Sequence, residues 1–282
     1  MKITLLGTGS PEAHVRRASS GYLVEVGADK ILLDCGGGVY DRLLQSGRRP
    51  SDITHLFLTH LHTDHMMDYA RLIHGAWDEG GAPLPVWGPA PIAGINDRFF
   101  GLNGAFAHDL RARTERPQKP DIWTANDRSA PVEWPHPNIT EIEPGFAWQG
   151  GGWRLTSCRA THAQPFLECM AFRIEADGKS FVYSGDTGIN DEVEALSQGA
   201  DLLLHWYYRP DKQGAAEAMR AKMPTPGDIA AMAARNGVKR LILTHFRKSM
   251  DDDATHQTTL AAMKAVFDGP ASIAEDLDQI IL

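Results

Sequence analysis

Four side chains that commonly bind metal ions lie within the six residues 60–65 of the chain. They are His60, His62, Asp64 and His65. Imidazole and carboxylate are the ligands that zinc and its first-row neighbours prefer. Because side chains alternate along an extended segment, His60 and His62 can point to the same side, which leaves Asp64 and His65 to bind a second ion. The spacing therefore predicts a metal site rather than a histidine-rich surface loop.

The elements around this segment are those needed to hold it in place. An apolar run over residues 53–58 predicts a buried strand that ends just before His60. Apolar residues then recur at helical spacing over residues 66–77, which predicts an amphipathic helix whose first turn lies beside the metal loop. Further strands are predicted over residues 31–33, 179–184, 201–205 and 238–243, and each ends at or near a histidine or aspartate.

The composition indicates an ordinary globular protein. With 282 residues the chain is long enough for one large α/β domain. Its net charge of −8 argues against sequence-independent binding to nucleic acid, where phosphate neutralisation supplies most of the affinity. No signal peptide is recognised, and no apolar run approaches the roughly 20 residues that span a bilayer. Cys35, Cys158 and Cys169 are scattered and indicate free thiols in a reducing compartment, so we expect a soluble cytoplasmic enzyme with no membrane partner.

Residues 75–153 differ in composition from the rest of the chain. Six of the seven tryptophans lie there, together with proline runs such as residues 83–85. A helix is predicted over residues 91–101, and the remainder is expected to form long loops. We treat this segment as an insertion in a single domain that covers residues 1–282. It is either a lid, pocket wall or dimer contact, or an insertion packed on itself by its aromatic side chains.

The segment from His60 to His65 resembles the signature of the metallo-β-lactamase superfamily of metal-dependent hydrolases. The opening, with Gly7, Thr8, Gly9 and Ser10, looks like the first strand and glycine turn of the ribonuclease Z and arylsulfatase-like branch. Residues 31–36, 161–162, 184–187 and 243–246 are similar to the later motifs of the family, in the expected order. The resemblance implies a four-layer αββα sandwich, in which two sheets lie face to face with helices outside.

The resemblance also implies a site with two divalent metal ions and seven protein ligands. The ligands of one ion would be His60, His62 and His162. Those of the other would be Asp64, His65 and His245. Asp186 would bridge both ions through its two oxygens, and a hydroxide would fill the other bridging position. Coordination lowers the pKa of the bound water toward 7, which makes a nucleophile at neutral pH. Zinc is the expected metal, with manganese or iron as alternatives.

Some expected roles lie outside simple ligation. Asp64 and His205 are expected to take part in catalysis, and Asp34 is expected to orient a ligand imidazole. Trp206 follows His205, whereas the corresponding strand end of ribonuclease Z resembles His-Glu-Ala-Thr. The loop after His245 also departs from the family pattern, and no segment resembles the flexible arm that clamps tRNA. Together with the acidic balance, these departures argue against tRNA maturation.

A substrate pocket is expected next to the metal site. Its candidate residues are Trp77, Trp206, Tyr207 and Arg209. With Tyr208, Trp206 and Tyr207 would form an aromatic wall for a ring-bearing substrate, and Arg209 would bind an anionic group. The competing interpretation is that the aromatic residues pack in the core and that Arg209 is an ordinary surface residue.

Three functions are compatible with these features. The leading one is hydrolysis of an ester-like bond in a small molecule, namely an aryl sulfate, phosphodiester or lactone, and nucleic acid is not the expected partner. The second is a ribonuclease Z-type tRNA 3′ endonuclease. The third is a non-catalytic binding protein with a vestigial site, which the complete ligand set argues against. Relatives in the family commonly dimerise, so a homodimer is the expected assembly.

Overall fold

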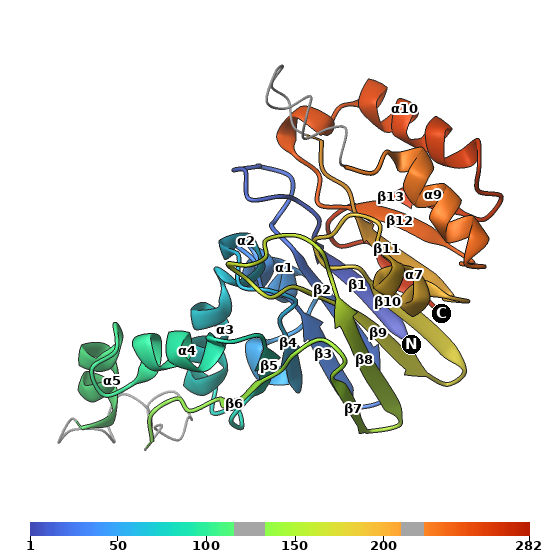
Figure 1. The fold of residues 1–282 in the computed structure, drawn as a ribbon. Helices are drawn as coiled ribbons and strands as arrows, with labels where there is room; N and C mark the ends of the chain where they lie inside the picture. Colours follow the sequence, from blue (N-terminus) through green and yellow to red (C-terminus); the bar gives the residue numbers. More distant parts are fainter. Residues whose placement is uncertain (116–132, 210–222) are drawn as a thin grey trace.

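In the computed structural model, which describes residues 1–115, 133–209 and 223–282, two seven-stranded sheets pack face to face. Figure 1 shows helices α1 to α5 on one side of the paired sheets and α7, α9 and α10 on the other. The prediction of a four-layer αββα sandwich is therefore confirmed.

Both sheets mix parallel and antiparallel strands. In spatial order, the first sheet contains β14 (Gln279–Ile281), β1 (Lys2–Gly7), β2 (Gly21–Val26), β3 (Asp29–Leu33), β4 (His55–Phe57), β5 (Pro85–Gly88) and β6 (Asn138–Glu141). The second contains β13 (Ala271–Ile273), β12 (Leu241–Thr244), β11 (Leu202–Trp206), β10 (Lys179–Tyr183), β9 (Met170–Ala176), β8 (Trp153–Arg159) and β7 (Ala147–Gly150). Strands β3 to β6 and β10 to β13 are parallel to their neighbours within each run.

The helices connect these strands. On the side of the first sheet they are α1 (Val39–Gln45), α2 (Thr63–Met66), α3 (Tyr69–Asp78), α4 (Ile92–Phe100) and α5 (Ala107–Thr114). On the side of the second sheet they are α7 (Asp191–Ser197), α9 (Pro226–Arg235) and α10 (Asp253–Lys264). Short 3-10 turns are η1 (Pro50–Asp52) and η2 (Lys248–Met250). Helix α9 begins as its sequence predicts, because the Thr225 side chain caps the N–H of Asp228 and Pro226 occupies the first turn.

Three apolar layers hold the sandwich together. Strand β11 shows how one strand serves two of them: Leu202 and Leu204 face the core between the sheets, whereas Leu203 faces the helices. A third layer joins the first sheet to α1, α3 and α4. Because both faces of β11 and β12 are covered, these two strands are buried at every position instead of alternating between buried and exposed residues.

The predicted helix over residues 66–77 is divided in two. Helix α2 ends at Met66, and α3 starts at Tyr69. The break occurs because the N–H of Asp68 donates to the carbonyl of Cys35, and the Asp68 carboxylate accepts the N–H groups of Gly38 and Tyr40. These tertiary hydrogen bonds replace the continued helical pattern and fix α2 against the first sheet.

Residues 75–153 contain more regular structure than their sequence predicts. Besides α4 and α5, they supply β5 and β6 at the edge of the first sheet and β7 at the edge of the second. The three strands span four residues each, which is too short to show a clear period of two. In Figure 1, α4 and α5 extend away from the paired sheets. Residues 116–132 lie outside the described residues.

The carboxyl ends of the parallel strands form the edge that carries the polar motifs. Asp34 follows β3 and the His60 segment follows β4, while Asp186 follows β10 and His245 follows β12. A hydrogen bond of 3.0 Å from the Met170 N–H to the Thr59 carbonyl joins the two sheets at this edge. Ligands commonly bind beyond the carboxyl ends of parallel strands.

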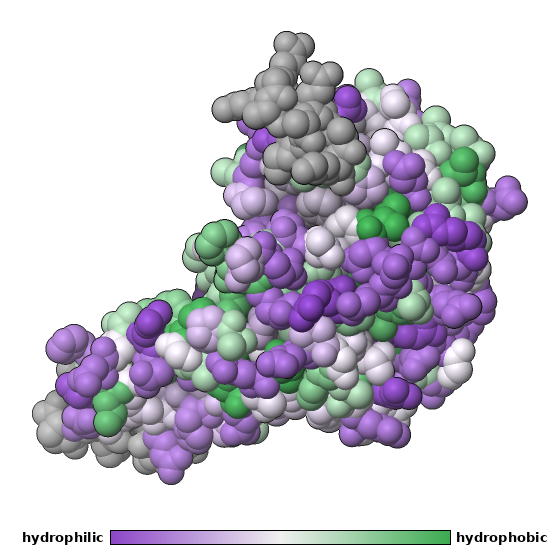
Figure 2. Space-filling view, viewed as in Figure 1, coloured by the Kyte–Doolittle hydropathy of each residue, from purple (hydrophilic) through white to green (hydrophobic). Residues whose placement is uncertain are grey.

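Within the described residues, no helix has the length and apolar character needed to cross a bilayer. On the face shown in Figure 2, hydrophilic side chains predominate and apolar ones are scattered.

Candidate metal centre

Three imidazoles form the first of two clusters at this edge. His60 and His62 lie between β4 and α2, and His162 lies in the loop after β8. His62 Nδ1 lies 3.0 Å from His60 Nε2 and 3.2 Å from His162 Nε2. His60 is buried, His62 is half-buried and His162 is exposed, so this cluster opens to solvent at His162.

Two carboxylates and two imidazoles form the second cluster. Asp64 and His65 belong to α2, Asp186 follows β10 and His245 follows β12. His245 Nε2 lies 3.1 Å from Asp64 Oδ2 and 3.2 Å from Asp186 Oδ2. His65 Nε2 lies 3.2 Å from Asp186 Oδ1. All four residues are buried, in contrast to the open first cluster.

Asp186 lies between the two clusters. Its Oδ2 is 3.2 Å from His245 Nε2 in the second cluster and 3.7 Å from His162 Nε2 in the first. The rings of His60 and His65, one from each cluster, have centroids 4.0 Å apart. This position suits a carboxylate that serves two ions. The structure thus brings together all seven expected ligands, in the two groups that the resemblance implies.

The donor set fits a pair of divalent cations. Among the described residues, His65 Nε2 and Asp186 Oδ1 are buried 3.2 Å apart and have no other hydrogen-bond partner, as expected of atoms that can ligate a cation. In a tetrahedral zinc site with bonds of about 2.0–2.1 Å, neighbouring nitrogens lie about 3.3 Å apart. The separations of 3.0 and 3.2 Å between imidazole nitrogens of the first cluster are close to that value.

The pKa shifts in the clusters favour cation binding. Burial raises the pKa of Asp186, but His245 and His65 outweigh this effect and hold that pKa well below its usual range. Burial is also the main cause that lowers the pKa of His60 and His162, so both imidazoles are neutral at pH 7. Burial lowers the pKa of His65 as well, but Asp186 and Asp34 raise it well above 6.5. A cation at His65 Nε2 would replace that proton.

Asp34 is fully buried beside the second cluster and accepts four hydrogen bonds. Its Oδ1 accepts the Thr59 N–H at 2.7 Å. Its Oδ2 accepts from His65 Nδ1 at 2.7 Å, Thr59 Oγ1 at 2.8 Å and Tyr183 Oη at 3.0 Å. This is the arrangement expected of a carboxylate that orients a ligand imidazole. Thr59 and Tyr183 were not predicted, and their only signal in the sequence is their closeness to His60 and Asp186.

Trp206 and His205 lie on opposite faces of β11. The Trp206 ring lies 6.0 Å from that of His162 and 5.9 Å from that of His245, so it borders both clusters. His205 is fully buried, and its Nδ1 bonds to the Trp206 carbonyl at 2.7 Å. Within the described part of the chain, no hydrogen bond, ion pair or ring contact joins His205 to the seven clustered residues. The structure does not bring this expected catalytic residue into the centre.

The aromatic wall next to the clusters differs from the expected one. Tyr208 is almost parallel to Trp206, with an interplanar angle of 8° and centroids 5.8 Å apart, and it lies 6.0 Å from the His245 ring. Tyr207 instead packs in the apolar layer under α9 and α10. Arg209 is exposed, and its carbonyl accepts from Arg247 Nη1. Alternation along the strand end explains why Trp206 and Tyr208 share a face that excludes Tyr207.

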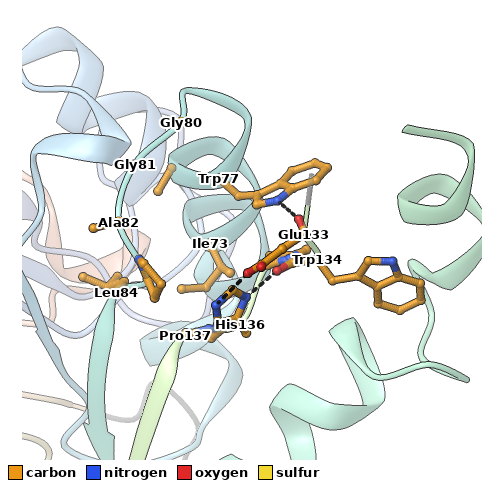
Figure 3. Close-up of a pocket in the computed structure, with 13 residues that line it drawn as sticks. Ile73, Trp77, Gly80, Gly81, Ala82, Leu84, Glu133, Trp134, His136 and Pro137 are labelled. Carbon is orange, nitrogen blue, oxygen red and sulfur yellow. Dashed lines mark hydrogen bonds and ion pairs between the residues drawn. The ribbon is translucent and has the colours of Figure 1, made fainter. Parts of the chain in front are cut away.

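Trp77 lies in a different cavity. Its indole N–H donates to the Glu133 carbonyl at 2.7 Å, and its ring lines an apolar cavity of about 210 Å³ with Ile73, Leu84 and Trp134. Figure 3 shows these side chains around the end of α3. None of the seven clustered residues lines this cavity, so the structure places Trp77 apart from the clusters, and its role in a substrate pocket stays a prediction.

Comparison with known proteins identifies the family. A family model described as "Beta-lactamase superfamily domain" matches residues 29–246. The chain is 32% identical over 290 residues to a ribonuclease Z of Mycobacterium bovis, a match that covers 99% of this chain and 98% of that protein. The fold is similar to that of the metallo-beta-lactamase fold protein YhfI from Bacillus subtilis, with a TM-score of 0.71, 22% identity and 99% of both chains covered. It is also similar to human tRNase Z, short form, with a TM-score of 0.69, 20% identity and coverage of 100% of this chain and 99% of that one.

These relatives correct the expected partner. The expectation of a small-molecule substrate in place of a nucleic acid is contradicted, because relatives that match the whole chain are ribonucleases by name. The error arose because a net charge of −8 is a sum over the chain and does not describe the local potential at the site. The matches over sequence and fold, together with the clustered histidines and aspartates, lead to one conclusion: the chain belongs to the metallo-β-lactamase superfamily, is homologous to ribonuclease Z, and is a metal-dependent hydrolase.

Proposed function

We propose that the protein is a tRNA 3′ endonuclease of the ribonuclease Z type, which hydrolyses a phosphodiester bond in precursor tRNA. The observation that carries this proposal is the 32% identity to ribonuclease Z along 99% of the chain. The arrangement of seven histidine and aspartate side chains in two adjoining clusters supports it. Three free cysteines fit a reducing compartment, so we place the activity in the cytoplasm.

The seven clustered residues would hold two metal ions, for which zinc is our first choice. Nitrogen and carboxylate ligands without thiolate suit zinc, with manganese or iron as alternatives. Two bound cations would supply Lewis acidity, which activates water and neutralises charge on a phosphate. Asp186 would bind both ions, and Asp34 would keep His65 in the orientation and tautomer needed for binding.

Other residues of the chain would govern how the substrate is placed. The His162 side of the clusters is exposed, so the phosphate would enter there. Trp206 is buried beside His162 at that opening, and the half-buried Tyr208 ring that lies parallel to it would be the ring offered to a nucleobase next to the cleaved bond. We assign His205 a structural role in β11, because its imidazole bonds to the Trp206 carbonyl outside the clusters.

The test is cleavage of a precursor tRNA with a 3′ trailer by the zinc-loaded protein. We expect one specific cut at the trailer, and no cut by the Asp186→Asn variant. A chromogenic phosphodiester is assayed in parallel. Hydrolysis of that compound without specific cleavage of the precursor would overturn the tRNA assignment. Fewer than one ion per chain after incubation with zinc or manganese would instead support the vestigial binding protein.

A further inference from the structure

Arg17 is a buried cation that lies outside the proposed ligand set. Its side chain is 0% exposed. Nη1 donates to Thr8 Oγ1 at 2.7 Å and to the Ala274 carbonyl at 2.5 Å. Nη2 donates to Asp251 Oδ1 at 2.7 Å and to Glu275 Oε1 at 2.6 Å. One guanidinium thus joins the loop after β1, the loop after β12 and the segment after β13, which is a use that needs the planar fork of arginine.

Thr8 links this cation to the second cluster. The Thr8 carbonyl accepts the N–H groups of His245 and Phe246, each at 2.9 Å. The Thr8 N–H and hydroxyl both bond to Asp276 Oδ1, at 3.1 and 2.7 Å. Thr8 is therefore held from two sides, by Arg17 and by Asp276, while it holds the backbone of a proposed ligand.

His245 depends on this support because its backbone is strained. Its φ is 73°, in the left-handed region that a residue with a Cβ adopts only when its surroundings impose it. In this conformation its Nε2 lies 3.1 Å from Asp64 Oδ2 and 3.2 Å from Asp186 Oδ2. A relaxed backbone would turn the imidazole away from both carboxylates.

We propose that Arg17 is a positioning residue for the second metal ion, which is the ion that the cluster with His65 and His245 would hold. It fixes Thr8, and Thr8 holds His245 in the conformation that faces Asp64 and Asp186. This inference rests on the ligand set given under the proposed function, but it does not depend on which phosphodiester is cleaved.

The acidic residues around Arg17 serve the guanidinium rather than a third metal ion. Asp251, His256 and Glu275 have ligand atoms close enough together to hold a cation. However, Asp251 is already paired with Arg16 at 2.6 Å and with Arg17 at 2.7 Å, and Glu275 is paired with Arg17. Two fixed positive charges at the same carboxylate oppose a divalent ion there.

The test compares Arg17→Lys with Arg16→Lys. Both residues contact Asp251, but Arg16 is 64% exposed at its side chain and does not contact Thr8. Metal-free proteins are titrated with zinc against a chromophoric chelator, which gives an affinity for each ion. We expect R17K to lower the affinity for the second ion about 10- to 100-fold and to leave the affinity for the first ion unchanged. Loss of a group that supports a metal ligand usually has an effect of this size. We expect R16K to bind both ions as the wild type does.

A second variant keeps the test decisive if R17K does not fold. Thr8→Val removes only the hydroxyl that links Arg17 to Asp276, so it should also lower the affinity for the second ion without changing the affinity for the first. Variants that melt earlier but bind both ions with wild-type affinity would overturn the inference, as would equal weakening of both ions. A wild-type protein that binds a single ion would overturn both the proposed ligand set and the role of Arg17. Failure of the Arg17 inference alone would instead leave two ions bound in the wild type, so the two failures can be distinguished.

Discussion

His65 donates a hydrogen bond from Nδ1 to Asp34 Oδ2 at 2.7 Å, and this bond turns the opposite ring nitrogen toward Asp186. Both side chains are fully buried. A carboxylate in this position fixes the tautomer of the imidazole and raises its basicity. The second cluster is therefore arranged by residues behind it before any cation arrives.

Replacement of Asp34 by asparagine should weaken metal binding. We expect Asp34→Asn to lower the affinity for the second ion about 10- to 100-fold, because the neutral amide no longer favours the charge that develops on the His65 ring. The affinity is measured by zinc titration against a competing chelator. Asp41→Asn is the control, since Asp41 pairs with Arg71 on the surface. Wild-type affinity in D34N would show that the Asp34 contact has no part in metal binding.

Removal of His62 should abolish hydrolysis without unfolding the chain. His62 is half-buried in a loop, so His62→Ala leaves no large cavity, yet the first ion loses one of its three imidazoles. We expect hydrolysis to fall at least about 100-fold with an unchanged far-UV circular dichroism spectrum. His136→Ala, which changes an exposed histidine outside the clusters, should keep full activity. Normal turnover by H62A would contradict the ligand assignment.

Trp206 should affect substrate preference more than metal content. Base stacking on an aromatic side chain contributes about 1–3 kcal/mol, and the buried Trp206 ring supports the Tyr208 ring on which a base would stack. Trp206→Leu should therefore lower kcat/KM for precursor tRNA about tenfold relative to a chromogenic phosphodiester. Tyr207→Phe serves as the control, because Tyr207 packs under α9 and α10. The measurement is the ratio of the two kcat/KM values together with the zinc content. A parallel loss of zinc and of both activities would mean that Trp206 is structural.

His205 should make the fold sensitive to acid. Burial lowers the pKa of His205 from 6.5 to about 4. As the pH falls below 6.5, the His205 imidazole takes up a proton in the unfolded chain before it does so in the folded protein. Its contribution to the free energy of unfolding is therefore fully present above pH 6.5 and is lost as the pH falls toward 4, by about 3 kcal/mol in total. Urea unfolding of metal-free protein should show a smaller decline in His205→Asn than in the wild type. The same slope in both proteins would contradict this account, and His136→Asn controls for the loss of a histidine.

Removal of metal should lower the melting temperature reversibly. Ions that bind only the folded state stabilise it by about 2.7 kcal/mol when their free concentration is 100 times the dissociation constant. We expect a chelator to lower the melting temperature and to stop hydrolysis, and zinc to restore both. No change in melting temperature upon complete removal of metal would exclude binding that is linked to folding.

The clustering of the seven candidate ligands could be predicted from sequence and from the family resemblance, because their chemical types and order along the chain are distinctive. The spacing of His60, His62, Asp64 and His65 is distinctive, and the later residues match motifs of the family in the expected order. Asp186 and His245 follow largely buried strands, whereas β8, which precedes His162, alternates buried and exposed residues. The strand before this segment was also predicted, although β4 is shorter than the apolar run over residues 53–58. Local sequence patterns therefore predict a site residue best where a buried apolar strand is followed directly by a histidine or an aspartate.

Features that depend on tertiary contacts could not be predicted. The face on which Trp206 lies depends on the register of β11, which a run of leucines does not reveal. Arg16 and Arg17 are neighbours of the same type, yet only the structure shows that one is buried and the other largely exposed. The break between α2 and α3 results from hydrogen bonds to residues about thirty positions away.

Each cluster takes its members from both halves of the sandwich. His60 and His62 follow a strand of the first sheet, whereas His162 follows a strand of the second, and the same division separates His65 from His245. On the proposed assignment, a cation cross-links the two sheets at their polar edge. A chain deprived of zinc would keep its apolar layers but lose these cross-links, and proteases would cut its loops sooner. The lifetime of the enzyme in a cell would then follow the supply of metal.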